Sequence, residues 1–414
     1  MNRNVQPKQQ NKQTVPEKRP APKRTQKIHR DIVKDNDIVR IRGDMDRTFL
    51  ILVIVLVCFG SVMVFSASYA YALASKGNSY YFIEKQLTFV AIGAIGMLVI
   101  ANMFDPAWIK KLTVPAFWTL VLMLVAVLVI GTSEGEAQRW LIIPGTSFGV
   151  QPSEFMKLGL VLALAKYFSD SEKYLDRKTT RFEPVIRRLI APLFIVAFVC
   201  ILVALEKHFS GVIILFLIGV IVIFAAGGQF WYMVGAAASF VAVLLPAIFF
   251  VPYAKGRIDI WLHPENYSSQ SETWQTLQGL NAVGSGGFFG VGLGQSLQKH
   301  MFVSQPQNDF IFAIICEELG FIGAVATIGL FVAFVWRGII IAFNAPDTFS
   351  KLTVVGIVSK VAIQAVLNMA VVTNLIPNTG ISLPFFSYGG SSLLMLFAEM
   401  GIILCISRYS YQDK

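Results

Sequence analysis

The chain consists largely of apolar runs separated by polar connections. The ten runs are 48–74, 87–103, 113–131, 153–169, 188–205, 210–227, 229–251, 309–335, 352–375 and 391–407. Each is long enough for an α-helix to cross the hydrocarbon core of a bilayer, which takes about 17 to 25 residues. The pattern therefore predicts an all-α polytopic protein of the cell membrane with about ten transmembrane helices.

The distribution of basic residues predicts the orientation of these spans. Residues 1–47 contain 13 Lys or Arg and 6 Asp or Glu, and the connection 170–188 is also basic. Because cytoplasmic connections are enriched in Lys and Arg, this side is expected to face the cytoplasm, and an even span count places both termini there. We expect a disordered basic tail over 1–47, a membrane domain over 48–408 with an outer loop at 252–308, and a C-terminal tail over 409–414.

Composition narrows the class further. With 55% hydrophobic and 14% charged residues, the chain is unlike a soluble domain. The net charge of +10 does not indicate nucleic-acid binding, because most of it lies in the tail, which is either solvated or in contact with anionic lipid or a cytoplasmic partner. The four cysteines lie in apolar runs without the spacing of metal ligands, and the four histidines are scattered, so no metal site is expected.

Asp309 is the leading candidate for a functional carboxylate. It stands where a polar segment containing Pro306 meets the eighth apolar run. Glu317 and Glu318 follow about 12 and 13 Å further along the helix axis. A charge inside a membrane needs a partner or a cavity, so these two are expected to pair with cations of neighbouring spans, whereas Asp309 is expected to act in function.

A second candidate region is the outward connection between the third and fourth runs. Arg139 and Trp140 stand side by side there and would suit an anionic, sugar-bearing ligand, although a Trp at this depth is also a common interface anchor. At the start of the fourth run, Ser153 can cap the helix and Glu154 suits its first turn. Lys157 follows one turn deeper on the same face.

Two further outward stretches have unusual composition. Residues 284–294 are rich in glycine, but without a βαβ unit they favour close backbone packing or a segment on the membrane surface over nucleotide binding. Lys299 lies shortly after them, ten residues before Asp309. Residues 378–392 contain Pro384 and three glycines in an apolar setting, so this irregular backbone is expected to line a cavity.

Several of these stretches together resemble the SEDS family (shape, elongation, division and sporulation). The similar blocks are 151–157 (QPSEFMK), 274–294, 308–313 (NDFIFA), 317–320 (EELG) and 381–392 (ISLPFFSYGGSS). They occur in the order and spacing of that family and extend the likeness over essentially 48–408. Ser382 makes the chain more similar to the FtsW/SpoVE branch than to the RodA branch, which usually has proline there.

The resemblance implies a peptidoglycan glycosyltransferase that polymerises lipid II at the outer face of the membrane, in cell division or sporulation. It implies that Asp309 is catalytic and that Arg139, Trp140, Lys157, Lys299 and Ser387 contact the substrate. Glu154, Glu317 and Glu318 are expected to be structural or electrostatic. The implied partners are a class B penicillin-binding protein and other division proteins. No metal ligands are assigned, although a divalent cation (Mg²⁺ or Mn²⁺) is possible at the pyrophosphate.

The chemistry also follows from the residues themselves. A sugar hydroxyl that attacks an anomeric carbon must lose a proton, and a single carboxylate can accept it as general base. Partial burial would raise the pKa of Asp309, and Lys157 is the cation expected to lower it. Arg139 and Lys299 are the outward cations expected to receive the leaving pyrophosphate.

The chain departs from the family pattern in two places. Gln307 follows Pro306 where the family often has Pro-Glu, and His208 stands where an acid is common. These departures make a role for a second carboxylate doubtful.

Two other classes of function stay open at this point. A lipid flippase could use buried charges as a relay, namely Glu317, Glu318, Lys360 and Glu399. A non-catalytic division scaffold could use the basic tail. Replacing Asp309 by Asn separates these alternatives from a polymerase, since only a polymerase would lose its activity.

Overall fold

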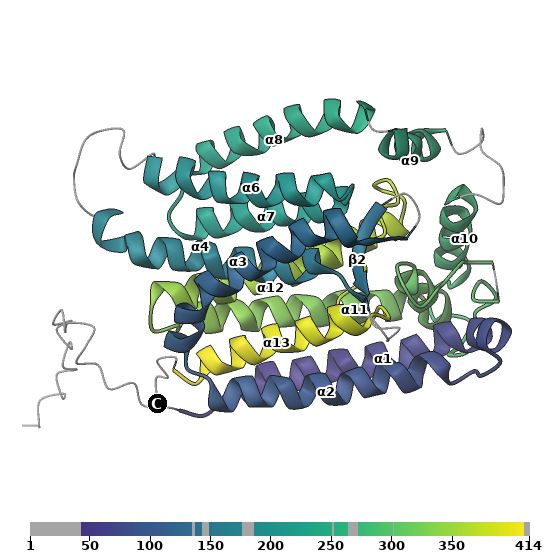
Figure 1. Ribbon diagram of the computed structural model, residues 1–414. Coiled ribbons are helices and arrows are strands. Elements are labelled where there is room, and N and C mark those ends of the chain that lie inside the picture. The colour runs from purple at the N-terminus through teal and green to yellow at the C-terminus, as the bar shows by residue number, and fades with distance from the viewer. Residues whose placement is uncertain are drawn as a thin grey trace, which may run out of the picture. The chain divides into compact units, whose positions relative to one another are not determined.

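The computed structural model describes residues 43–134, 137–142, 149–175, 186–250, 252–263, 272–300 and 302–409. The expected tail over 1–47 lies almost entirely outside these residues. A bundle of long helices dominates the described part (Figure 1). They are α1 (Arg47–Lys76), α2 (Tyr81–Met103), α3 (Pro106–Ile130), α4 (Pro152–Leu175), α6 (Ala191–Leu205), α7 (Phe209–Ala225), α8 (Phe230–Phe250), α11 (Ile311–Phe343), α12 (Thr348–Val372) and α13 (Gly390–Ser407).

Seven helices in the described part are long and apolar enough to cross a membrane. These are α1, α2, α3, a helix over Arg187–Leu205 that includes α6, α11, α12 and α13. α7 and the segment Phe230–Ala242 of α8 are apolar but shorter. Many large apolar side chains on these helices face outward, among them Trp118, Leu122 and Val129 of α3. An apolar outer surface of this kind is stable in contact with lipid, so the protein is a multi-pass membrane protein.

The two ends of the described chain meet at one end of the bundle. The backbone N–H of Gly43 donates to the carbonyl of Arg408 at 2.8 Å. Beside them, Asp46 caps α1 through the N–H of Phe49 and binds Arg337, the Nη2 atom of which lies 2.7 Å from Oδ2. α11 therefore has its C-terminal end here, and Asp309 lies at the opposite end of the bundle.

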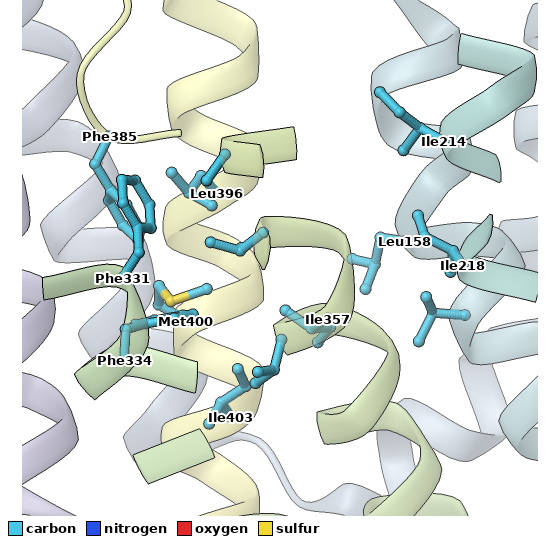
Figure 2. Packing of buried hydrophobic residues seen from close by; sticks show 14 of the residues in the cluster. Leu158, Ile214, Ile218, Phe331, Phe334, Ile357, Phe385, Leu396, Met400 and Ile403 are labelled. Atoms are coloured by element: carbon cyan, nitrogen blue, oxygen red, sulfur yellow. The ribbon is translucent and has the colours of Figure 1, made fainter. Parts of the chain in front are cut away.

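The core of the bundle is apolar and closely packed. Figure 2 shows Phe331 and Phe334 of α11 beside Phe385, with Leu396 and Met400 of α13 close by. The rings of Phe334 and Phe385 are 5.8 Å apart between centroids. A Cβ atom at Gly60 of α1 would collide with the carbonyl of Phe385, so this glycine lets the loop before α13 pack directly on α1. This loop, which connects α12 to α13, is thereby held inside the protein.

A small antiparallel sheet contradicts the expectation of an all-α protein. β1 (Thr132–Glu134) pairs with β2 (Ala137–Ile142), and β2 pairs with β3 (Gly149–Val150). In the register, Thr132 is opposite Trp140 and Leu141 is opposite Val150. The branched and aromatic residues of this connection suit a pleated surface, and the sheet fixes the orientation of the stretch that carries Arg139 and Trp140.

The connection 252–308 contains two helices where we expected a loop. α9 (Pro252–Leu262) follows α8, and α10 (Glu272–Ser285) packs against α11. A Cβ at Gly279 would collide with the ring of Phe310, so α10 lies very close to the start of α11. Both helices lie near the end of the bundle that holds Asp309 (Figure 1).

Candidate active site

A polar cavity of about 560 Å³ opens at the Asp309 end of the bundle. Its walls come from α2, the small sheet, the first turns of α4 and α7, the segment before α11, α12 and the loop before α13. The titratable side chains that line it are Lys85, Arg139, Glu154, Lys157, His208, Asp309 and Tyr388. Of the residues expected to form the site, the structure brings together Asp309, Arg139, Trp140, Glu154 and Lys157.

The main chain around Asp309 is held by three neighbouring groups. Asn368 of α12 donates from Nδ2 to the carbonyl of Asp309 at 2.7 Å and to the carbonyl of Ile381 at 2.7 Å. Ser387 donates from Oγ to the carbonyl of Asn308 at 2.7 Å. The N–H of Tyr388 donates to the carbonyl of Gln307 at 2.8 Å. The segment 307–309 is thus tied both to α12 and to the loop before α13.

The carboxyl group of Asp309 lies in a half-buried position against Gly380. A Cβ at Gly380 would come within 3.2 Å of Oδ2, and the positive φ of 64° also favours glycine there. Burial raises the pKa of Asp309 to about 6, and the nearby guanidinium of Arg257 limits this rise. A carboxylate with a pKa near 6 is largely ionised at neutral pH and can accept a proton.

The cation that acts on Asp309 is Arg257 rather than Lys157, contrary to our expectation. Arg257 lies on α9 and donates from Nη1 to the carbonyl of Asn378 at 2.9 Å, which fixes the turn that leads to Gly380. Lys157 instead pairs with Glu154, and its Nζ lies 2.6 Å from Oε1. This pair, three residues apart on α4, forms part of the cavity wall.

Ser153 does not cap α4, because the helix already begins at Pro152. Its hydroxyl lies 3.2 Å from Nδ1 of His208, which also lines the cavity. Burial, with Arg139 and Lys157 nearby, lowers the pKa of His208 to about 3, so the imidazole is neutral at physiological pH. His208 therefore offers the cavity a neutral hydrogen-bonding group where the family often has an acid.

Glu206 lies just before His208 and has a different character. It is fully buried, and burial raises its pKa to about 8, with Arg139 opposing the rise. It does not line the cavity. At neutral pH it is therefore mostly protonated, and it does not supply a second ionised carboxylate.

The cations at the cavity wall come from two separate elements. Arg139 of β2 donates from Nη2 to the carbonyl of Lys207 at 3.1 Å, and Trp140 packs on Gly149 of β3. Lys85 of α2 lines the cavity and donates to the hydroxyl of Tyr81 at 2.7 Å. Lys157 is neutralised by Glu154, so Lys85 and Arg139 supply positive charge suited to a phosphate-bearing ligand.

Four residues assigned from the sequence lie outside this cavity. Lys299 is completely buried, and its Nζ lies 2.6 Å from Oε1 of Glu318. Glu317 and Glu318 lie in the same buried cluster, where Glu318 pairs with Lys299 of the outer connection and Glu317 accepts hydrogen bonds from Ser296 and Leu297. Ser387 accepts from the N–H of Leu383 and donates to Asn308, so its hydroxyl is engaged by the main chain. Lys299 and Ser387 therefore do not line this cavity, and their contact with a substrate stays a prediction.

No group of three or more His, Cys, Asp or Glu side chains that could hold a metal ion occurs in the described residues. In the cavity, Glu154 is engaged by Lys157, which leaves Asp309 as the carboxylate best placed to approach an ion. The possible Mg²⁺ or Mn²⁺ stays a prediction, and such an ion would be bound mainly by phosphate oxygens of the substrate.

Sequence reasoning missed three residues of the site. Lys85 lies in the polar connection just before the second apolar run, and nothing in its surroundings marks it. Asn368 is a polar residue within the ninth apolar run, which is a weak signal for a buried bridge. Arg257 lies in the outer connection, and its proximity to Asp309 depends on how α9 folds back.

The fold and the cavity define a polytopic membrane protein with the carboxyl group of Asp309 in a cation-lined site. Comparison with known proteins makes the assignment specific. Residues 46–412 match the family of FtsW, RodA and SpoVE cell cycle proteins, and the chain belongs to this family.

Relatives of known name agree over most of their length. The stage V sporulation protein E of Bacillus subtilis is 38% identical over 374 residues, 88% of this chain and 97% of that protein. The probable peptidoglycan glycosyltransferase FtsW of Trichlorobacter lovleyi is 36% identical over 372 residues, 88% of this chain and 93% of that protein.

Solved structures show the same fold. RodA of Thermus thermophilus superposes with a TM-score of 0.64 at 25% identity, covering 89% of this chain and 98% of that one. A chain from a peptidoglycan synthase complex that coordinates polymerization and crosslinking superposes with a TM-score of 0.72 at 24% identity, covering 89% of this chain and 99% of that one.

Proposed function

We propose that this protein is a peptidoglycan glycosyltransferase that polymerises lipid II into glycan strands. The single observation that carries the proposal is the carboxyl group of Asp309, with a pKa near 6, in a cavity that also holds Lys85 and Arg139. The name of the FtsW relative agrees with this activity, and the family name and that of the sporulation relative agree with service in cell division or sporulation.

In the proposed reaction, Asp309 is the general base. The hydroxyl oxygen of the acceptor sugar forms a bond to the anomeric carbon of the donor, and the bond from that carbon to the diphosphate oxygen breaks. The hydroxyl proton passes to the carboxylate of Asp309, and the diphosphate-linked lipid leaves. A base with a pKa slightly below the working pH combines high ionisation with useful basicity. Lys85 and Arg139 receive the charge of the diphosphate.

The neutral wall of the cavity suits the sugar part of the substrate. Trp140 offers an aromatic face, and His208, Ser210 and Gln364 offer neutral hydrogen-bonding groups. With Asp309 as the base, no second carboxylate is needed, unlike in glycoside hydrolases that use a pair of acids.

The proposed topology has ten crossings, formed by α1, α2, α3, α4, α6, α7, α8, α11, α12 and α13. The contact between Gly43 and Arg408 supports an even number, because both ends of the described chain lie together. The basic tail indicates that this end is cytoplasmic and that the cavity opens outward, where lipid II polymerisation takes place. The expected partner is a class B penicillin-binding protein, in line with the related synthase complex.

The test is glycan-strand synthesis from purified lipid II in the presence of the cognate class B penicillin-binding protein with an inactivated transpeptidase. We expect polymer from the wild type and none from Asp309→Asn, with the complex intact in both. As a matched control, Asp105→Asn changes a partly exposed helix-capping carboxylate at the other end of the bundle and should preserve synthesis. Polymer from Asp309→Asn would contradict the role of Asp309, and no polymer from the wild type would favour a flippase or a scaffold.

A further inference from the structure

α11 is interrupted near its outer end. Gly320 has φ 65° and ψ −160°, which no α-helix contains, so the helix consists of a short segment over 311–319 and a longer one over 321–343. At a rise of about 1.5 Å per residue the longer segment spans roughly 35 Å, enough to cross a bilayer by itself. The short segment is the one that follows Asp309.

Residues 286–299, which we call the wedge, fill this interruption with main-chain hydrogen bonds. The N–H groups of Val291 and Gly292 donate to the carbonyls of Glu317 and Glu318 at 2.9 and 3.0 Å. On the other side of the break, the N–H of Phe321 donates to the carbonyl of Gly287 at 2.9 Å. Unpaired backbone groups near a membrane are costly, so the break in α11 and the wedge stabilise each other.

Two glycines allow this close approach. A Cβ at Gly286 would collide with the carbonyl of Cys316, and one at Gly290 would collide with the carbonyl of Glu318. Gly290 also has a φ of 82°, which favours glycine. The glycine-rich stretch thus serves backbone packing, one of the two roles that its composition indicated.

Buried side chains lock the wedge onto α11 and α1. Lys299 and Glu318 form an ion pair at 2.6 Å, and both side chains are fully buried. The other oxygen of Glu318 accepts from the hydroxyl of Ser66 on α1. Glu317 accepts from the hydroxyl of Ser296 and from the N–H of Leu297, the latter at 3.0 Å. Because charges buried this deeply must be paired, these contacts, which we call the lock, hold the wedge in a defined position.

The lock and Asp309 are connected from both sides. Downstream of the wedge, the N–H of Val303 donates to the carbonyl of Gln298 at 3.0 Å, and Ser304 accepts from Gln275 of α10 at 2.9 Å. Asp309 follows this stretch directly and leads into the short segment of α11, which ends at the locked acids. The chain on either side of Asp309 is therefore anchored to the same cluster.

We infer that the wedge is a positioning element for the proposed reaction and that Lys299 and Glu318 are its positioning residues. The inference rests on the proposed function and assigns to Lys299 a role other than contact with the substrate. The ion pair holds the wedge in the break of α11, and the wedge holds the segment before Asp309 at the height where its carboxylate meets the acceptor hydroxyl.

The first test measures position without using activity. In a cysteine-free background in nanodiscs, spin labels are placed at Ser304, before Asp309, and at Ser75 near the end of α1, both exposed. When this labelled protein carries no further substitution, we expect a narrow distribution of the distance between the two labels. Lys299→Met leaves Glu318 buried without its partner and should broaden or shift the distribution. Lys299→Met with Glu318→Met removes both charges and should restore much of the narrow distribution.

Two further variants make this measurement specific. Lys360→Met breaks the buried Lys360–Glu399 pair, which also has a distance of 2.6 Å but lies away from the wedge, and should leave the Ser304–Ser75 distance unchanged. Ser66→Ala removes one neutral hydrogen bond to Glu318 without leaving an unpaired charge. It should therefore broaden or shift the distribution slightly, and this measurement can be made even if Lys299→Met does not fold.

The second test uses the polymerisation of lipid II. A displacement of the base by about 1 Å can cost on the order of 10²-fold in rate. We expect Lys299→Met to lower kcat to this extent with a much smaller change in KM, and the double variant to recover part of kcat. An unchanged distance distribution together with an unchanged kcat in Lys299→Met would overturn the inference. If the wild type makes no polymer, the proposed function fails, and the spin-label distances alone decide whether the wedge is locked.

Discussion

At the scale of single residues, the carboxyl group of Asp309 carries a cost in stability. Its pKa is raised to about 6 in the folded protein, above the ordinary value of 3.8, so the ionised form is less favourable when folded than when unfolded. The penalty on folding therefore grows as pH rises above the ordinary pKa, is complete above the folded pKa, and disappears again as pH falls to the ordinary pKa.

Asp309→Asn should remove this penalty. We expect the variant to be more stable than the wild type by about 2–3 kcal/mol above pH 6, with the gain vanishing as the pH falls from 6 to 4. Thermal unfolding of the purified protein at a series of pH values measures the difference. A gain that is equal at pH 4 and pH 7.5, or a loss at pH 7.5, would contradict the buried, ionised carboxylate.

Which site residues are predictable from the sequence depends on how conspicuous they are. Asp309, Glu154 and Lys157 are charges at the edges of apolar runs, where a charge is costly without a reason, and all three line the cavity. Arg257 acts on Asp309 across more than 50 residues of chain, through the fold of α9. Lys299 was a conspicuous charge as well, but sequence alone does not distinguish a cation that faces a cavity from one buried against an acid.

At the scale of elements, α12 holds the segment that contains Asp309 in place through one side chain. Asn368 donates to the carbonyls of Asp309 and Ile381, and thus links α12 to the segment before α11 and to the loop before α13, which both line the cavity. Asn368→Leu keeps a similar volume and loses both hydrogen bonds. We expect kcat to fall about tenfold or more while KM changes little, because the base is misplaced and the ligand-binding cations are not.

Steady-state polymerisation by the purified complex measures this effect. Asn102→Leu is a suitable control, because Asn102 lies at the far end of α2, where its amide donates to the carbonyl of Leu98 and accepts from Arg408. A rise in KM alone, or equal loss in both variants, would exclude a bracing role for Asn368.

The elements that the sequence predicted best are those with a strong apolar pattern. The ten apolar runs correspond to ten long helices, mostly within a few residues at each end. α10 was missed because its buried side includes Thr273, Gln278 and Gly279, so it shows no apolar period. The sheet was missed because strands of two to six residues leave almost no pattern.

At the scale of the whole molecule, the proposed topology places the cavity outside and the meeting point of Gly43 and Arg408 inside. Single cysteines at Ser304 and at Lys111, both exposed, lie near opposite ends of the bundle. In intact cells, a membrane-impermeant maleimide should label the cysteine at 304 and not the one at 111. After permeabilisation it should label both. Labelling of position 111 in intact cells would contradict the orientation.

The central claim is that Asp309 is the general base of the polymerisation and that burial and Arg257 together set its pKa. It is tested most directly by the pH dependence of kcat/KM for lipid II polymerisation in the wild type, Arg257→Lys and Arg257→Met. The other titratable groups of the cavity (Lys85, Arg139, Glu154, Lys157, His208 and Tyr388) are the same in all three.

In the wild type, the rate should fall on the acid side with a midpoint near pH 6, because protonated Asp309 cannot accept a proton. Arg257→Met removes the charge that limits the pKa of Asp309 and should move this midpoint to higher pH. Arg257→Lys keeps the charge and should move it less. The same acid midpoint in all three proteins, or a shift to lower pH in Arg257→Met, would contradict Asp309 as the general base.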